Sequence, residues 1–145
     1  MKPIDPLHLL QLGPVWMLSA IAGTGTTFSA SDRDAFWETV HSVALRTPPA
    51  ARVVLESVLR AGPGLFLDFE LDDRPLASGL RNVSEVLDEM DSELSADYRL
   101  ALLRIGVGLA KARGPYGRQV SAENEQLLLL LAELLDLRSA SEAAG

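Results

Sequence analysis

The chain has 145 residues, a formal net charge of -7 and no cysteine. This length fits one domain with a sizeable core, and the absence of cysteine excludes disulfides, thiolate zinc sites and cysteine nucleophiles. The negative charge argues against specific DNA or RNA binding, because proteins that contact phosphate backbones usually present basic surfaces. No apolar run approaches the ~20 residues that span a bilayer and no signal-peptide pattern begins the chain, so we expect a soluble, cytoplasmic protein without membrane insertion.

The first 22 residues predict two helical segments separated by proline. Asp5 followed by Pro6 is a cap with proline at the first helical position, which predicts a short helix over residues 7–12. Gly13 and Pro14 are expected to break or restart this helix. The segment that follows supplies apolar side chains to the core, namely Trp16, Met17 and Ile21.

Two further helices are predicted between residues 29 and 64. Ser29 and Asp32 form a capping pattern that opens a helix to about Leu45. Its apolar face comprises Phe36, Val40, Val43 and Ala44. Residues 47–49, Thr-Pro-Pro, are expected to stop it and to cap a helix that ends at the Gly-Pro-Gly of residues 62–64. The apolar stripe of this second helix comprises Val54, Leu55, Val58 and Leu59.

The passage LFLDFELDD, residues 65–73, shows the only strand-like alternation in the chain. Since no second strand is in view to pair with it, we interpret it as an extended connector or a helical turn. A helix then restarts at Asp73 and Pro75. Its apolar residues follow a heptad-like spacing too short for an independent coiled coil: Leu76, Leu80, Val83, Leu87 and Met90.

We expect the chain to be organised around residues 97–137, which predict a helix, a short loop and a second, almost wholly apolar helix. In the first of these helices, Leu102, Ile105, Leu109 and Ala112 share a face, and glycines 106 and 108 favour close approach of a neighbouring helix. The five consecutive leucines of residues 127–131 leave no face for water, so the second helix is predicted to be central, or covered on one side by a partner. Its expected core residues are Leu128, Leu131 and Leu135.

These elements predict an all-α fold, a single compact domain of six to eight helices over residues 1–138. The remaining residues 139–145, Ser-Ala-Ser-Glu-Ala-Ala-Gly, are expected to be a frayed tail.

A pattern of an apolar residue, serine and alanine before an acidic helix start occurs twice. Phe28-Ser29-Ala30 matches Val120-Ser121-Ala122, and Asp32 matches Asn124. Two such hairpins, one early and one late, indicate a duplicated helical unit. Over residues 7–137 this layout resembles the TerB-like family of tellurite-resistance-associated proteins. The resemblance implies an all-helical adaptor or stress-response domain in which Phe28 and Val120 enter the core at equivalent places.

The hairpin loops depart from the pattern of that family, which reads alanine-x-alanine-aspartate-glycine before the apolar residue and serine. Gly25 and Arg113 stand where the family has loop aspartates, and Thr26 replaces the family glycine that Gly114 retains. Each loop has therefore lost a hard-oxygen ligand, and Arg113 adds a positive charge. We expect no tight calcium or magnesium site in either loop.

Four acids at the two helix starts are the candidate metal ligands: Asp32, Asp34, Glu123 and Glu125. They could hold a hard cation if the two helix starts approach one another. The alternative is that they cap the helices and complement their dipoles. His41, near Glu38 and Asp34, could act as a base or ligand or be an ordinary surface histidine.

The other candidate sites have ordinary structural explanations. The loop GTGTT of residues 23–27 lacks the lysine of a phosphate-binding P-loop, and no serine lies in a GxSxG context. The tryptophans Trp16 and Trp37 are expected to pack in the core, although one of them could line a groove.

Three functional hypotheses follow. The first is a non-enzymatic helical interaction or adaptor domain without a cofactor, acting through a protein partner. The second is a divalent-metal-binding regulator or small enzyme that uses the acidic helix starts. The third is a homo-oligomer whose leucine-rich helix is covered by its own copy. We favour the first because catalytic constellations are missing from the sequence.

Overall fold

Helices account for most of the computed structural model, which describes residues 5–22, 28–72, 76–113 and 122–134. They are α1 (Pro6–Ala22), α2 (Ala30–Leu45), α3 (Pro49–Ala61), α4 (Gly64–Glu70), α5 (Leu76–Asp88), α6 (Ser92–Arg113) and α7 (Ala122–Leu134). These described ranges contain seven helices and no strand, which confirms the predicted all-α class and helix number.

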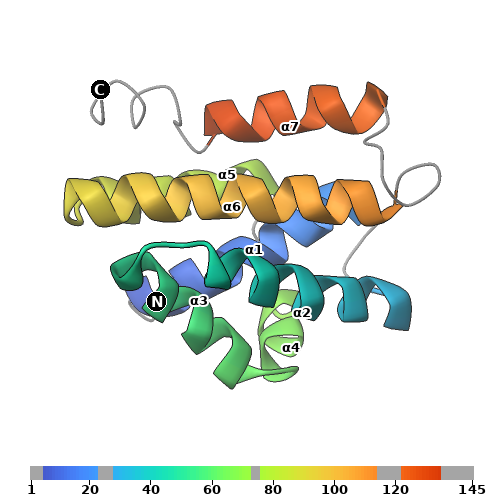
Figure 1. Ribbon diagram of the computed structural model, residues 1–145, viewed down its shortest axis with the longest axis horizontal. Helices are drawn as coiled ribbons and strands as arrows, with labels where there is room; N and C mark the ends of the chain where they lie inside the picture. Colours follow the sequence, from blue (N-terminus) through green and yellow to red (C-terminus); the bar gives the residue numbers. More distant parts are fainter. Residues whose placement is uncertain (1–4, 23–27, 73–75, 114–121, 135–145) are drawn as a thin grey trace.

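Helix α6 runs through the middle of the molecule, with α7 on one side of it and α2 and α3 on the other (Figure 1). Helices α1 and α5 lie behind α6 in this view, and α4 closes the lower edge. Helix α1 contacts each of the other six helices. The core is therefore built around α1 and α6, while α7 is an outer layer.

Helix α1 is continuous through Gly13 and Pro14, so the predicted break is wrong. Proline lacks the N–H that would bond to the carbonyl four residues earlier, which leaves the carbonyl of Leu10 without its helical donor. The Tyr98 hydroxyl of α6 donates a hydrogen bond to this carbonyl. Tyr98 is completely buried, and burial raises the pKa of its hydroxyl, so Tyr98 stays protonated and able to donate. A contact from a distant helix thus stabilises a proline inside α1.

Helix α2 begins as predicted, with the capping box of Ser29 and Asp32. The Asp32 N–H donates to the Ser29 hydroxyl at 3.0 Å, and the Ser29 N–H donates to the Asp32 carboxylate at 3.2 Å. The predicted apolar face, Phe36, Val40, Val43 and Ala44, is buried. Thr47 does not cap α3, because its hydroxyl donates back to the Val43 carbonyl at 2.7 Å, and α3 begins without a side-chain cap.

The strand-like passage forms a helix, α4, so the helical-turn interpretation is the correct alternative. Phe66 and Phe69 of α4 point into an aromatic cluster with Phe28, whose ring centroid lies 5.7 Å from each of theirs. The predicted burial of Phe28 is confirmed. Val120, its expected counterpart, lies outside the described residues.

Helices α5 and α6 are joined by a buried arginine. The guanidinium of Arg99 donates to the Ser84 hydroxyl at 2.6 Å, to the Ser95 hydroxyl at 3.0 Å and to the Asp88 carboxylate at 2.6 Å. Three apolar residues of the predicted α5 stripe are fully buried: Leu80, Val83 and Leu87. The predicted use of the α6 glycines is confirmed, because a Cβ atom on Gly106 would lie 2.7 Å from Cε of Met17.

Helix α7 is an outer helix, so the predicted central position is wrong, and the alternative, that a partner covers one side of it, stays a prediction. Leu128 and Leu131 are buried as predicted, with 9% and 1% of their surfaces exposed, whereas Leu129 and Leu130 are 69% and 58% exposed. Leu135 lies outside the described residues. On α6, Ala112 is exposed although the predicted apolar face included it. The leucine run packs on α6 by one side only, because none of the other six described helices lies beyond it (Figure 1).

Candidate functional site

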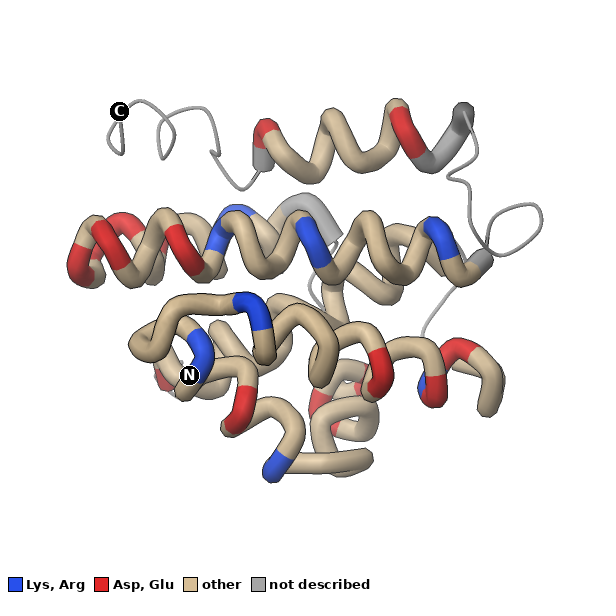
Figure 2. The backbone as a smooth tube through the Cα atoms, in the orientation of Figure 1, with Lys and Arg blue, Asp and Glu red and all other residues tan. Residues whose placement is uncertain are grey.

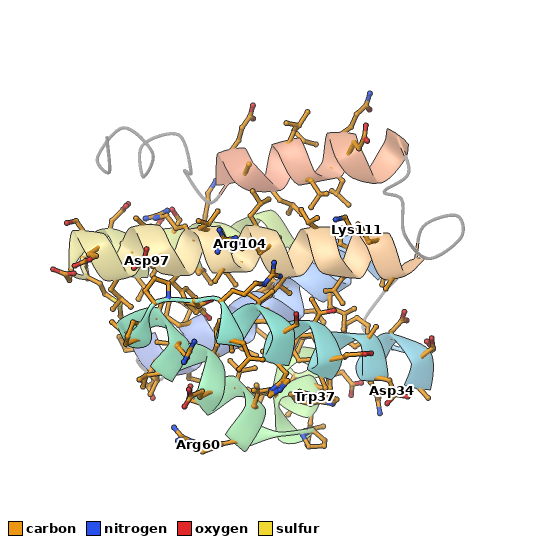
Figure 3. The ribbon with its side chains drawn as sticks, viewed as in Figure 1. Asp34, Trp37, Arg60, Asp97, Arg104 and Lys111 are labelled. Atoms are coloured by element: carbon orange, nitrogen blue, oxygen red, sulfur yellow. The ribbon has the colours of Figure 1, made fainter. Side chains whose placement is uncertain are left out.

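The three candidate metal ligands whose side chains the structure describes, Asp32, Asp34 and Glu125, do not form a cluster. Asp32 is engaged in the α2 capping box, and Asp34 lies exposed at the outer end of α2 (Figure 3). Glu125 is exposed on α7, and the side chain of Glu123 is outside the described set. The starts of α2 and α7 lie at the same end of the molecule with α6 between them (Figure 1). Among the described residues no group of three or more histidine or acidic side chains could hold a metal ion.

The histidines lie at the surface, whereas Trp37 packs against aromatic side chains. His41 is exposed on α2, and His8 has Nε2 3.6 Å from a carboxylate oxygen of Asp68, with both side chains part-exposed. Trp37 packs edge-on against Phe36 at 4.9 Å and Phe66 at 5.4 Å, measured between ring centroids. The GTGTT loop is outside the described residues.

Trp16 is buried against α4 and α5, as predicted for a core residue. Its ring meets Phe69 edge-on at 4.8 Å, and its indole N–H finds no hydrogen-bond acceptor among the described residues. A Cβ atom on Gly79 would lie 2.4 Å from the indole ring, so glycine is what allows α5 to pack there.

The exposed leucines of α7 lie in a stripe on its outer side. Gln126, Leu129, Leu130 and Glu133 are all exposed, and their spacing of three, four and seven residues places them on one helical face. We call this set the α7 outer stripe. Figure 3 shows side chains of α7 pointing away from α6. The sequence alone did not reveal which leucines face outward, because five in a row carry no helical phase.

A groove of about 270 Å³ lies between α2 and α6. Its lining is Glu38, Thr39, Ser42, Val43, Arg46, Arg104 and Gly108. Arg104 lies on the side of α6 that faces the viewer in Figure 3. The sequence alone does not indicate this groove, because the two arginines are far apart in the chain and no local motif connects them.

A smaller hollow of about 200 Å³ lies between α1 and α5, lined by Leu9, Asn82, Glu85, Val86 and Glu89. Its two glutamates belong to the last part of α5, and several red residues gather at the end of α5 and the start of α6 in Figure 2. Basic residues are spread over several helices in the same view.

Comparisons with protein-family models, curated proteins and solved structures give no match to this chain. Within the described ranges, the helices lack the combined length and apolar character needed to cross a membrane. The function is therefore inferred from the chain itself, without help from a related protein.

Proposed function

We propose that this chain is a non-enzymatic helical interaction domain of the TerB-like kind, an adaptor or stress-response component that binds an amphipathic helix of a partner protein. The observation that carries the proposal is the α7 outer stripe. Leu129 and Leu130 stand side by side with more than half of each side chain in water. A partner that buried them would gain about 1.5–3 kcal/mol for each leucine.

The geometry of α7 suits a helix as the ligand. The stripe follows one face of a straight helix that packs on α6 by the opposite face. An amphipathic partner helix with apolar residues at three- and four-residue spacing can lie against such a face. The interaction would extend the helical layering that already places α7 on α6.

Charge favours a basic partner over a second copy of this chain. Glu125 and Glu133 flank the leucines, and the whole chain has a net charge of -7. Two copies would bring acids against acids, whereas lysines or arginines beside the apolar stripe of a partner would complement them. We therefore assign the stripe to a helix with a leucine stripe flanked by basic residues.

Binding of a synthetic helical peptide tests the proposal. The peptide carries leucines at helical spacing flanked by lysines, and its affinity is measured by fluorescence anisotropy. Replacing both stripe residues (Leu129→Ser with Leu130→Ser) should weaken binding at least ~100-fold, because each leucine is worth about tenfold or more. Leu45→Ser, an equally exposed leucine on α2, is the matched control and should change nothing.

Two outcomes would refute the assignment. Equal affinity for a glutamate-flanked version of the peptide would remove the charge argument. A concentration-dependent dimer in sedimentation that the double serine variant abolishes would assign the stripe to a second copy instead.

The stress-response role is tested separately, by survival of a tellurite-sensitive bacterial strain that expresses the chain. We expect wild type to raise survival and the double serine variant to fail. If neither protein has an effect while the peptide still binds wild type, the TerB-like role is wrong and the interaction domain stands.

A further inference from the structure

We propose that the groove between α2 and α6 binds a small phosphate monoester through the guanidinium groups of Arg46 and Arg104. The two arginines come from different helices, Arg46 from the C-terminal end of α2 and Arg104 from the middle of α6, and both line the same groove. Thr39 and Ser42, each of which carries a hydroxyl, line it as well. The site is independent of the α7 outer stripe.

Neither guanidinium is used by the fold. Arg52 donates to the carbonyls of Ala44 and Leu45 at the end of α2, and Arg99 is buried on Asp88. The side chains of Arg46 and Arg104, by contrast, have no hydrogen-bond or ion-pair partner in the described part of the chain, and both are exposed. Their donors are therefore available to a ligand.

The charge and donor set fit phosphate better than a carboxylate. A carboxylate has two oxygens and one charge, so a single arginine satisfies it in the bidentate geometry. A phosphate monoester carries about -1.5 to -2 charges at pH 7 and three acceptor oxygens, which match two guanidiniums and a hydroxyl. Two arginines in one groove of an acidic protein thus point to a dianion.

Glu38 gives the preference for an ester over free phosphate. Glu38 lines the same groove, and its carboxylate repels the phosphate of either ligand, so the preference comes from a contact that only the organic part adds. The same carboxylate accepts a hydrogen bond from a hydroxyl on the organic part of a ligand. The groove volume of about 270 Å³ leaves room for such a part beside the phosphate.

The position of one wall is fixed by a close helix contact. A Cβ atom on Gly108 would lie 2.7 Å from Cγ2 of Thr39, so α2 and α6 approach closely there. Val43, 1% exposed, anchors α2 in the core beneath the groove. The donors of Arg46 and Arg104 consequently project from two helices whose separation is held by packing.

The test is an NMR titration of ¹⁵N-labelled protein with glycerol phosphate and, separately, with inorganic phosphate at constant ionic strength. We expect saturable shifts at backbone amides of α2 and α6 around the groove, with glycerol phosphate binding more tightly. Arg46→Gln and Arg104→Gln should each weaken binding about tenfold or more, as expected for loss of charged hydrogen bonds. Lys111→Gln removes the same charge from exposed α6 outside the groove and should change affinity by less than about twofold, because screening weakens distant charges.

Several results would overturn the inference. They are non-saturable shifts, equal weakening by Lys111→Gln and Arg104→Gln, or tighter binding of inorganic phosphate than of glycerol phosphate. The last result would also exclude the role given to Glu38. Both arginines are exposed, so unchanged thermal melting of the variants is expected and separates lost binding from lost folding. The double serine variant of α7 should titrate like wild type, which distinguishes failure of this site from failure of the proposed interaction domain.

Discussion

Helices α1 and α7 are both rich in apolar residues, yet they differ in how much of their apolar side chains is exposed to water. In α1 the long run from Leu12 to Leu18 is buried without interruption. In α7 the buried Leu128 and Leu131 alternate with the exposed Leu129 and Leu130. The difference lies in the neighbours, since α1 contacts all six other helices whereas α7 contacts only α1, α5 and α6.

The apolar content of a helix therefore does not determine how deeply the helix is buried in a fold. A helix that is apolar all round can be surrounded by others or can keep a face for an external ligand. For α1 the first solution holds, even though it includes a proline and a glycine that weaken helices. For α7 we propose the second solution, with the exposed Leu129 and Leu130 as the face for a partner.

The largest expected loss of stability is for a leucine buried in α1. Leu18→Ala should lower the free energy of unfolding by about 2–5 kcal/mol, because Leu18 is fully buried and the cavity cannot collapse easily between several helices. Leu131→Ala on the inner side of α7 should also cost at least about 2 kcal/mol. Urea denaturation of both variants checks this. An unchanged midpoint for Leu131→Ala would mean that α7 contributes little to the cooperative core.

A smaller effect is expected for Tyr98→Phe, which leaves the Leu10 carbonyl of α1 buried without a donor. The cost should be about 1–3 kcal/mol at pH 7. Burial raises the pKa of Tyr98 in the folded protein. In the unfolded chain Tyr98 is exposed and ionises near its ordinary pKa of about 10, so above this pH ionisation favours the unfolded state. Stability from this group is therefore complete below pH ~10 and is lost as the pH rises further.

Urea denaturation at pH 7 and at about pH 11 measures both parts of this prediction, given the ordinary tyrosine pKa near 10. The stability advantage of wild type over Tyr98→Phe should shrink at the higher pH. An advantage that grows instead would contradict the raised pKa, and no advantage at either pH would remove the role of the hydroxyl in α1.

The smallest expected effect is at the outer stripe. Leu129→Ala should change the free energy of unfolding by no more than ~0.5 kcal/mol, because an exposed leucine loses little packing. Leu131→Ala, two positions along the same helix, is the matched comparison. Equal destabilisation by the two substitutions in thermal melts would show that both sides of α7 are buried in solution, against the contrast with α1.

The parts of the fold that the sequence predicts correctly are those encoded by residues close together in the chain. Ser29 and Asp32 lie three residues apart, and the hydrogen bonds of a capping box need only that spacing. The spacing of Leu80, Val83 and Leu87 likewise encodes one helical face, and all three are buried. The predicted break in α1 is wrong because Gly13 and Pro14 disfavour a helix locally, whereas the hydroxyl that stabilises the helix there belongs to Tyr98 of the distant helix α6.

The site could be predicted only in part for the same reason. The capping role of Asp32 is visible in its own segment, and the structure shows it. The groove is lined by Arg46 and Arg104 from two helices, which approach each other closely where Gly108 packs against Thr39. The metal hypothesis for Asp34 and Glu125 relied on two helix starts approaching one another, but α6 lies between them.

The bond between the Tyr98 hydroxyl and the Leu10 carbonyl has a consequence for the order of folding. It joins residues 88 positions apart, so a large loop must close before it forms. Until then α1 has a missing hydrogen bond at Pro14, and the N-terminal helix emerging from a ribosome would be incomplete. Non-local contacts of this kind slow folding relative to helical proteins held by local pairs. The N-terminal segment that occupies the centre of the finished domain would consequently mature only after α6 has been synthesised.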